Sequence, residues 1–373
     1  MIEVKRNIEE LIYKSEAFLT RVDVDKPLVG VGIIGREYMR FYKETSKYMK
    51  EGEQLNPDDI IIEDFIKDVD NFILMHEEAG GDLFYPAAPF YYIPWMEAII
   101  GCPIYVGKES FYTKPCIDEW ENFSMNIDLR NNKWLHKFIE IKSALVEHLN
   151  VSYPISTSSL LRGPADMMAA SLGQTRFPLE LYDNPEKIKK LCQLYSNIFI
   201  EIAGIANKIA LNSKFTGYLV DYYGIWSPKI CQYFQDDAVA LISPKFYEMF
   251  IFNEHLKISK SFGSTFYHLH PISLFIIDKL LALPNLDVIE INREPVGPPI
   301  EELIPSLKQI QDHDRSLLIN FTNIDFSSEL IEEEIRTIYH NLSMRGLGIF
   351  ISAENVDDGI KKINAVNKVL RLG

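Results

Sequence analysis

The stretch Thr265-Phe266-Tyr267-His268-Leu269-His270-Pro271 is an apolar, aromatic run that ends in two histidines and a proline. Such a composition is typical of a β-strand. Alternate side chains of a strand share one face, so we expect His268 and His270 to project in the same direction from the strand end. Imidazoles transfer protons near neutral pH and bind borderline metal ions. The pair therefore predicts a functional site, with the alternative that each ring only hydrogen-bonds to core backbone.

Short strand-forming runs on both sides of this stretch alternate with amphipathic helical patterns. The predicted strands are residues 28–33, 82–85, 151–155, 216–221, 264–270, 287–292, 316–321 and 347–352. The predicted helices include residues 185–212, 244–262, 300–312, 328–345 and 357–372. This alternation favours an α/β fold, a closed (β/α)8 TIM barrel, over a doubly wound open sheet. No glycine-rich phosphate loop follows any predicted strand, which weakens the open-sheet alternative.

The interval 86–150 is too long for a single crossover helix and carries a cluster of prolines and aromatic residues. We expect it to form a lid-like extension, inserted after the second strand, over the mouth of one barrel domain that spans residues 1–373. Tyr92 and Trp95 are then candidates to cover a planar or apolar substrate. A cap braced by its prolines and packed on itself accounts for the same cluster equally well.

Composition narrows the function classes. The 373 residues are 47% hydrophobic and 24% charged, which indicates a globular protein with a large core. A formal net charge of −15 argues against nonspecific binding to nucleic acid or to an anionic membrane. The four cysteines are scattered without CxxC spacing, and neither a signal core nor a membrane-spanning run is present. We therefore expect a cytoplasmic enzyme with a small-molecule substrate, no nucleic-acid partner and no membrane partner.

In a barrel, catalytic residues lie at the carboxyl ends of the strands. Asp221, Tyr222 and Trp226 follow the fourth predicted strand and would supply a carboxylate beside an aromatic wall; a capped loop packed on the barrel is the alternative. Asn292 lies at the end of the sixth strand. Arg36, just after the first strand, would clamp a carboxylate or phosphate, or would only pair with a neighbouring acid.

Three local motifs resemble the uroporphyrinogen decarboxylase superfamily, which also contains cobamide-dependent methyltransferases. Residues 163–173 (GPADMMAASLG) are similar to its GPxTxAxxLxG helix start, and residues 181–186 (LYDNPE) to its DxPE helix start. Asp236 and Asp237, followed by residues 241–247 (LISPKFY), are similar to its acidic residue before LSPxxF. The resemblance extends from about residue 25 to the C-terminus. It implies a (β/α)8 barrel and places Asp237 in the site.

The decarboxylase branch is marked by an RQAGR segment and an FSDI motif, and this chain departs from both. Residues 30–36 (GVGIIGR) keep only Gly35-Arg36, and residues 83–89 (LFYPAAP) contain no acid. Loss of that carboxylate removes the group that would stabilise a cationic decarboxylation intermediate. The resemblance therefore disfavours a uroporphyrinogen-type decarboxylase.

The methyltransferase branch is marked by a zinc site of the form His-x-Cys with a further cysteine near the last strand. Here His270 stands where that cysteine would be, and residues 348–354 (GIFISAE) contain none. His268, His270 and Glu290 or Glu354 would still make an open three-ligand zinc site. Without a metal, the histidines would bind substrate or act as acid and base.

The resemblance implies an enzyme that moves a methyl group between a small organic donor, a corrinoid carried by a partner protein and a thiol acceptor. His268 and His270 would position the metal or the acceptor, and Asp221 and Asp237 would handle charge or protons. Decarboxylation of a carboxylated ring without metal is the first alternative. A barrel that only binds a ligand or a corrinoid protein is the second. The resemblance also implies a homodimer.

Overall fold

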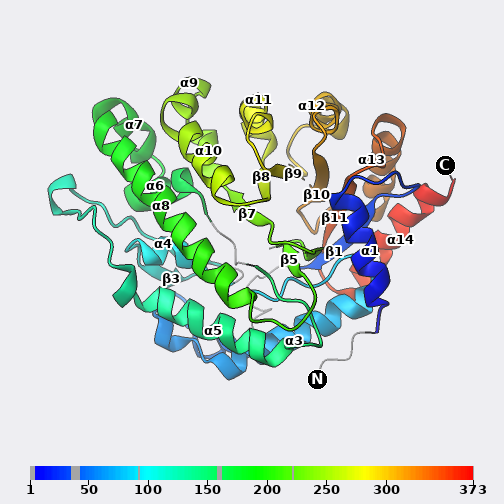
Figure 1. Ribbon diagram of the computed structural model, residues 1–373, viewed down its shortest axis with the longest axis horizontal. Coiled ribbons are helices and arrows are strands. Elements are labelled where there is room, and N and C mark those ends of the chain that lie inside the picture. The colour runs from blue at the N-terminus through cyan, green and yellow to red at the C-terminus, as the bar shows by residue number, and fades with distance from the viewer. Residues whose placement is uncertain (1–4, 35–42, 91–92, 158–161, 221, 373) are drawn as a thin grey trace.

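The computed structural model describes residues 5–34, 43–90, 93–157, 162–220 and 222–372. Its centre is a six-stranded parallel sheet in the order β1-β11-β10-β9-β8-β7 (Figure 1). These strands are β1 (Leu28–Ile33), β7 (Gln232–Gln235), β8 (Thr265–Leu269), β9 (Leu286–Arg293), β10 (Ser316–Phe321) and β11 (Leu347–Ala353). Almost every residue of the six strands is buried, as expected for a parallel sheet covered on both faces.

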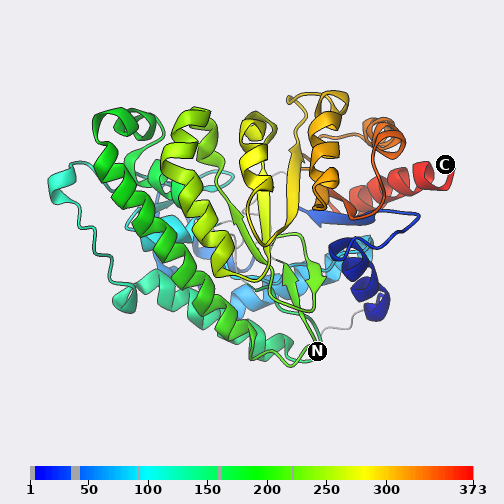
Figure 2. The same ribbon diagram turned by 45° about the horizontal axis from the view of Figure 1, so that its top comes forward.

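Helices connect the successive strands and cover the outside of the sheet (Figures 1 and 2). Those of the second half are α9 (Pro244–Phe246), α10 (Phe252–Ser261), α11 (Ile277–Leu281), α12 (Ile300–Asp312), α13 (Ser328–Asn341) and α14 (Val356–Leu372). A π-helical turn, η6 (Tyr247–Ile251), joins α9 to α10, and two 3₁₀ turns, η5 (Asp237–Leu241) and η7 (Pro271–Ile276), follow β7 and β8. The predicted helices of this half are confirmed, with ends shifted by at most a few residues.

The first half is more helical and less regular. Its helices are α1 (Ile8–Leu19), α3 (Ile62–Ala79), α4 (Trp95–Ile99), α5 (Lys133–Leu149), α6 (Pro164–Leu172), α7 (Arg176–Asp183) and α8 (Pro185–Ala210). Single 3₁₀ turns are η1 (Thr45–Tyr48), η2 (Pro57–Asp59), η3 (Trp120–Asn122) and η4 (Leu129–Asn131). Both α6 and α8 begin with a proline at the first helical position, where its missing N–H costs no hydrogen bond. No helix within the described ranges is long and apolar enough to cross a bilayer.

Five of the predicted strands lie in the central sheet, and three do not. Residues 82–85 and 151–155 contain no named strand, although the neighbouring Ser156 makes a single parallel bridge to Leu219. Within 216–221, β5 (Tyr218–Val220) pairs antiparallel with β6 (Ile225–Ser227). The turn between them has positive φ at Tyr222 and Gly224, which reverses the chain at once. The mixed α/β fold is thus established, with a six-stranded parallel sheet.

One strand of the sheet, β7, was not predicted. It has only four residues, Gln232-Tyr233-Phe234-Gln235, and both ends are glutamines. Its parallel pairing with β8 makes this short segment a strand. Sequence analysis missed β7 because its pairing with β8, and not a local apolar pattern, makes it a strand.

The interval 86–150 forms α4, a hairpin of β3 (Ile104–Val106) and β4 (Phe111–Thr113), and α5. Strand β2 (Gln54–Leu55) joins the hairpin as a third antiparallel strand. Helix α5 packs on α8, as the lower half of Figure 1 shows. Ile93, Pro94 and Glu97 from the start of this interval, and Phe111 from the hairpin, line the large cavity described below.

Candidate metal centre

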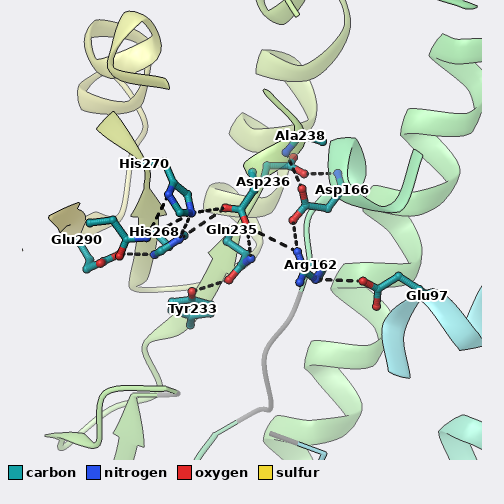
Figure 3. Close-up of polar contacts among 12 residues, drawn as sticks. Glu97, Arg162, Asp166, Tyr233, Gln235, Asp236, Ala238, His268, His270 and Glu290 are labelled. Carbon is teal, nitrogen blue, oxygen red and sulfur yellow. Dashed lines mark hydrogen bonds and ion pairs between the residues drawn. The ribbon is translucent and has the colours of Figure 1, made fainter. Parts of the chain in front are cut away.

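The carboxyl ends of β7 and β8 bring three polar side chains, Asp237, His268 and His270, to one point. Figure 3 shows the two imidazoles, with Glu290 of β9 behind them. His268 is the fourth residue of β8, His270 follows the strand, and Asp237 opens η5 two residues after β7. Parallel register sets Gln235 beside His268 and His268 beside Glu290, so neighbouring strands present these side chains at one level. His268 and His270 share a face because they are two residues apart in extended backbone.

The three donor atoms form a compact triangle. His268 Nε2 lies 3.0 Å from His270 Nε2, and Asp237 Oδ1 lies 3.6 Å from each. Ligands placed about 2.0–2.1 Å from a tetrahedral zinc ion are separated by about 3.3 Å, which lies between these distances. Asp237 Oδ1 is buried without a hydrogen-bond partner, an arrangement that is costly unless a cation or donor contacts it. The triangle therefore fits a divalent metal ion.

Carboxylates hold both imidazoles from behind. Glu290, which is fully buried, accepts a hydrogen bond from His268 Nδ1. Glu294 Oε1 lies 2.5 Å from His270 Nδ1. With a metal bound, a proton kept on each Nδ1 would leave the Nε2 lone pairs directed at the common point, as in the histidine sites of zinc proteins. Burial by itself lowers the pKa of His268, but the Glu290 carboxylate outweighs it and raises the pKa to about 9.

Asp237 is held from the opposite side. Its Oδ2 accepts a hydrogen bond from Gln235 Nε2 at 2.8 Å and lies 3.6 Å from Arg162 Nη1. Arg162 also pairs with Glu97 at 3.0 Å and with Asp166 at 3.3 Å. Burial lowers the pKa of Arg162, but these carboxylates outweigh it and raise the pKa further above its ordinary value. The guanidinium therefore stays charged, and because Gln235 and Arg162 contact Oδ2, Oδ1 of Asp237 is left without a hydrogen bond and faces the imidazoles.

Below the triangle, two aspartates lock η5 to the start of α6. Asp236 Oδ1 accepts from the Asp166 backbone N–H, and Asp166 Oδ1 accepts from the Ala238 backbone N–H, both at 2.7 Å. Asp236 Oδ2 lies 2.7 Å from His255 Nε2, and His255 Nδ1 lies 3.1 Å from the Tyr247 hydroxyl. Burial, followed by the charge of Asp237, raises the pKa of Asp166 well above its ordinary value. Asp236 thus serves the scaffold and Asp237 the site.

A cavity of about 880 Å³ adjoins the triangle. The metal-site residues Asp237, His268 and His270 belong to its wall. Aromatic and amide side chains complete the wall near the strand ends, among them Tyr222, Tyr233, Phe111, Asn292 and Asn320. The volume is in the range that accommodates a small organic molecule beside a metal ion.

The structure places the predicted site residues differently from one another. His268, His270 and Asp237 meet at the triangle, and Tyr222 and Asn292 line the cavity. Glu290, predicted as the third metal ligand, hydrogen-bonds to His268 Nδ1 behind the triangle, and Asp237 lies at the third corner because it projects from the neighbouring strand end. Arg36, Tyr92 and Asp221 lie outside the described residues.

Trp95 and Trp226, predicted to bind substrate, are core residues, and neither is among the described residues that line the cavity. Trp95 is 1% exposed and stacks on Phe138 with ring centroids 4.2 Å apart. Trp226 is 3% exposed, and its indole N–H donates to the Thr216 carbonyl at 2.8 Å. Large aromatic surfaces gain more from such burial than from facing a solvent-filled mouth.

Sequence reasoning missed Arg162, Gln235, Glu294 and Asn320. Arg162 directly precedes the helix start at Gly163, and Glu294 follows the predicted sixth strand, so position alone was a usable signal for these two. Gln235 was missed together with β7, to which it belongs. No protein-family model and no curated protein matches this chain, so the chemistry of the site is argued from its own geometry.

Proposed function

We propose that this protein is a zinc-dependent methyltransferase of the uroporphyrinogen decarboxylase superfamily. It moves a methyl group from a small organic donor, directly or by way of a corrinoid on a partner protein, to a thiol acceptor. The observation that carries the proposal is the triangle of His268 Nε2, His270 Nε2 and Asp237 Oδ1 at the wall of an open cavity.

The donor set supports zinc. Two imidazole nitrogens and one carboxylate oxygen are ligands that zinc accepts, and three protein ligands leave a fourth position for a substrate. When bound, the metal lowers the pKa of a thiol and presents it as a nucleophile. The cavity has room for that fourth ligand, because the three residues of the triangle line it.

The surrounding charges support a thiol substrate. Asp237, Glu290 and Glu294 place three carboxylates around the two imidazoles. Their negative charge offsets a divalent ion, so a sulfur beside it keeps more electron density and attacks carbon more readily. In the transfer, the thiol would first lose its proton to solvent in the cavity, the S–C bond would form, and the bond from the methyl carbon to the donor would break. The leaving group retains that electron pair.

The resemblance also implies that the chain closes into a full (β/α)8 barrel. Three backbone hydrogen bonds beyond the central sheet support this: Asp82 N to Val29 O at 2.7 Å, Gly163 N to Gln235 O at 2.6 Å, and Leu219 N to Ile155 O at 2.9 Å. They join the second predicted strand region to the first, the fourth to the third, and the start of α6 to β7. In this proposal, residues 1–373 are one domain, residues 86–150 are its inserted cap, and two copies form a homodimer.

Metal content tests the proposal first. The purified protein is expected to bind one zinc ion per chain in a titration followed by elemental analysis. His270→Ala and Asp237→Asn should lose it, and Glu290→Gln should bind zinc about 10–100-fold more weakly because the ring of His268 is no longer oriented. His313→Ala is the matched control, since His313 is an exposed histidine at the end of α12. Equal zinc content in all four variants would refute the metal site.

Product analysis tests the reaction. The zinc-loaded protein is incubated with thiols and either small methyl donors or methylcobalamin, and methyl thioethers are measured by mass spectrometry. Zinc-dependent thioether formation, lost in Asp237→Asn, is the expected result. Conversion of uroporphyrinogen to coproporphyrinogen by the metal-free protein would instead establish decarboxylation.

A further inference from the structure

Asn320 offers an unused hydrogen-bond acceptor in the cavity wall. It lies on β10, is 1% exposed and lines the cavity. Its Nδ2 donates to Asn292 Oδ1 at 3.0 Å and to the Tyr223 hydroxyl at 3.2 Å, which fixes the orientation of the amide. Its Oδ1 is buried and has no hydrogen-bond partner. A buried carbonyl oxygen of this kind is costly to leave unpaired, so it points to a donor on the ligand.

This acceptor lies close to the metal site. His270, Asn292 and Asn320 come from the successive strand ends of β8, β9 and β10, and Asn292 contacts both neighbours. Two strand spacings correspond to roughly 10 Å. A ligand with a donor group a few bonds from its reactive atom therefore reaches both places at once.

The charge of the described wall favours a cation. Its acidic members are Glu97, Glu109, Asp237, Glu294 and Asp325, and among the described lining residues the only lysine or arginine is Arg162. The guanidinium of Arg162 is already paired with three carboxylates. Even with a divalent ion at the triangle, this part of the wall keeps an excess of negative charge and attracts a positively charged group.

We propose that the acceptor is an aminothiol, whose protonated amine donates a hydrogen bond to Asn320 Oδ1 while its sulfur occupies the open position beside His268 and His270. The inference rests on the proposed function, because it takes the thiol as the substrate of the metal site. It competes with the prediction that Arg36, which lies outside the described residues, anchors an anionic substrate.

Binding to the cobalt-loaded protein tests the inference without any turnover. Sulfur coordination to Co²⁺ produces a charge-transfer absorption band, which gives a dissociation constant for each thiol. The probes are cysteamine, thiocholine, 2-mercaptoethanol and 2-mercaptoethanesulfonate. Thiocholine keeps the positive charge of cysteamine but has no N–H, so cysteamine should bind about tenfold more tightly, the contribution of one hydrogen bond from a charged donor.

Variants then locate the amine. In Asn320→Leu, the preference for cysteamine over thiocholine should fall about tenfold from its wild-type value. Comparing the ratio of the two dissociation constants between proteins cancels the different acidities of the two thiols. Asn323→Leu is the matched control: Asn323 lines the same cavity, but its Oδ1 already accepts the Asp325 backbone N–H at 2.8 Å. This variant should keep the wild-type ratio.

The outcomes separate the two proposals. If no thiol produces the band, the thiol site fails, and the aminothiol inference fails with it. If all four thiols bind and the sulfonate binds most tightly, the metal and thiol proposals stand, and the aminothiol inference alone is overturned. Equal wild-type affinity for cysteamine and thiocholine would also overturn it, whether or not Asn320→Leu folds.

Discussion

At the scale of single residues, partners decide what each histidine does. His268 and His76 are both buried, but their pKa values move in opposite directions: the Glu290 carboxylate outweighs burial at His268, whereas burial dominates at His76. His76 Nδ1 donates to the Phe72 carbonyl at 2.8 Å, and its Nε2 accepts the Ile33 backbone N–H at 3.1 Å. A proton on Nε2 would face that N–H. Burial accordingly lowers the pKa of His76 to about 4.

His76 should therefore make stability depend on pH. Its folded pKa of about 4 lies below the ordinary value of 6.5, so between these values the unfolded chain binds a proton that the folded chain does not. The contribution is fully present above pH 6.5 and is lost as the pH falls towards 4, by about 3 kcal/mol in total. Urea unfolding in a chelating buffer at pH 7, 6 and 5 measures it. The difference between wild type and His76→Gln should shrink over this range, and parallel profiles would contradict the assignment.

At the scale of elements, the metal site depends on how α6 meets η5. Gly163, which precedes α6, donates its backbone N–H to the Gln235 carbonyl at 2.6 Å. A Cβ at this position would lie 2.6 Å from Asp236 Cγ and 2.7 Å from the Gln235 carbonyl oxygen. Only a glycine permits this approach, and the approach lets Asp166 and Asp236 lock the backbone that carries Asp237.

Gly163→Ala should thus weaken both the fold and the metal site. The added methyl group must push α6 away from η5, at a cost of about 1–3 kcal/mol in the free energy of unfolding. Zinc affinity, measured by competition with a chromophoric chelator, should fall in the same variant. The control is Gly204→Ala in α8, where a Cβ would meet no atom within 4 Å. It should gain about 0.5–1 kcal/mol and bind zinc normally, since alanine favours the helix. Normal zinc binding by Gly163→Ala would show that the hydrogen bonds of Asp166 and Asp236 between α6 and η5 do not position Asp237.

At the scale of the whole molecule, the proposed ion would connect residues from successive strands that long helical segments separate in the sequence. Asp237 comes from the end of β7, His268 from β8, and Glu290 behind it from β9. A ligand that binds these elements only in the folded chain stabilises the fold by mass action. Metal binding and unfolding of the sheet are therefore coupled.

Zinc should consequently raise the melting temperature. At a free concentration a thousandfold above its dissociation constant, the ion adds about 4 kcal/mol, which for a chain of 373 residues corresponds to about 5 °C. Differential scanning calorimetry with zinc and with a chelator measures the shift, which Asp237→Asn should abolish. A shift of the same size in that variant would locate the stabilising ion elsewhere.

Local patterns were sufficient to predict most of the second half of the chain. The runs 316–321 and 300–312 were predicted with the bounds that β10 and α12 have, because each is a clean apolar pattern between turn residues. The prediction of strands at residues 82–85 and 151–155 failed, because these segments are short and the local sequence does not indicate a pairing partner. The pairing of His268 with His270 was readable from their spacing, whereas the placement of Asp237 beside them came only from the resemblance.

The sequence by itself determined which segments are strands and helices in the regular half, and that two imidazoles share one face, because both follow from the periodicity of the backbone. Only the tertiary structure decided that Asp237 lies beside the two imidazoles, that Glu290 hydrogen-bonds to His268 from behind, and that Trp95 is core. These roles depend on which strand ends become neighbours and on what remains buried between them. That information lies in contacts between residues far apart in the chain, which no local pattern encodes.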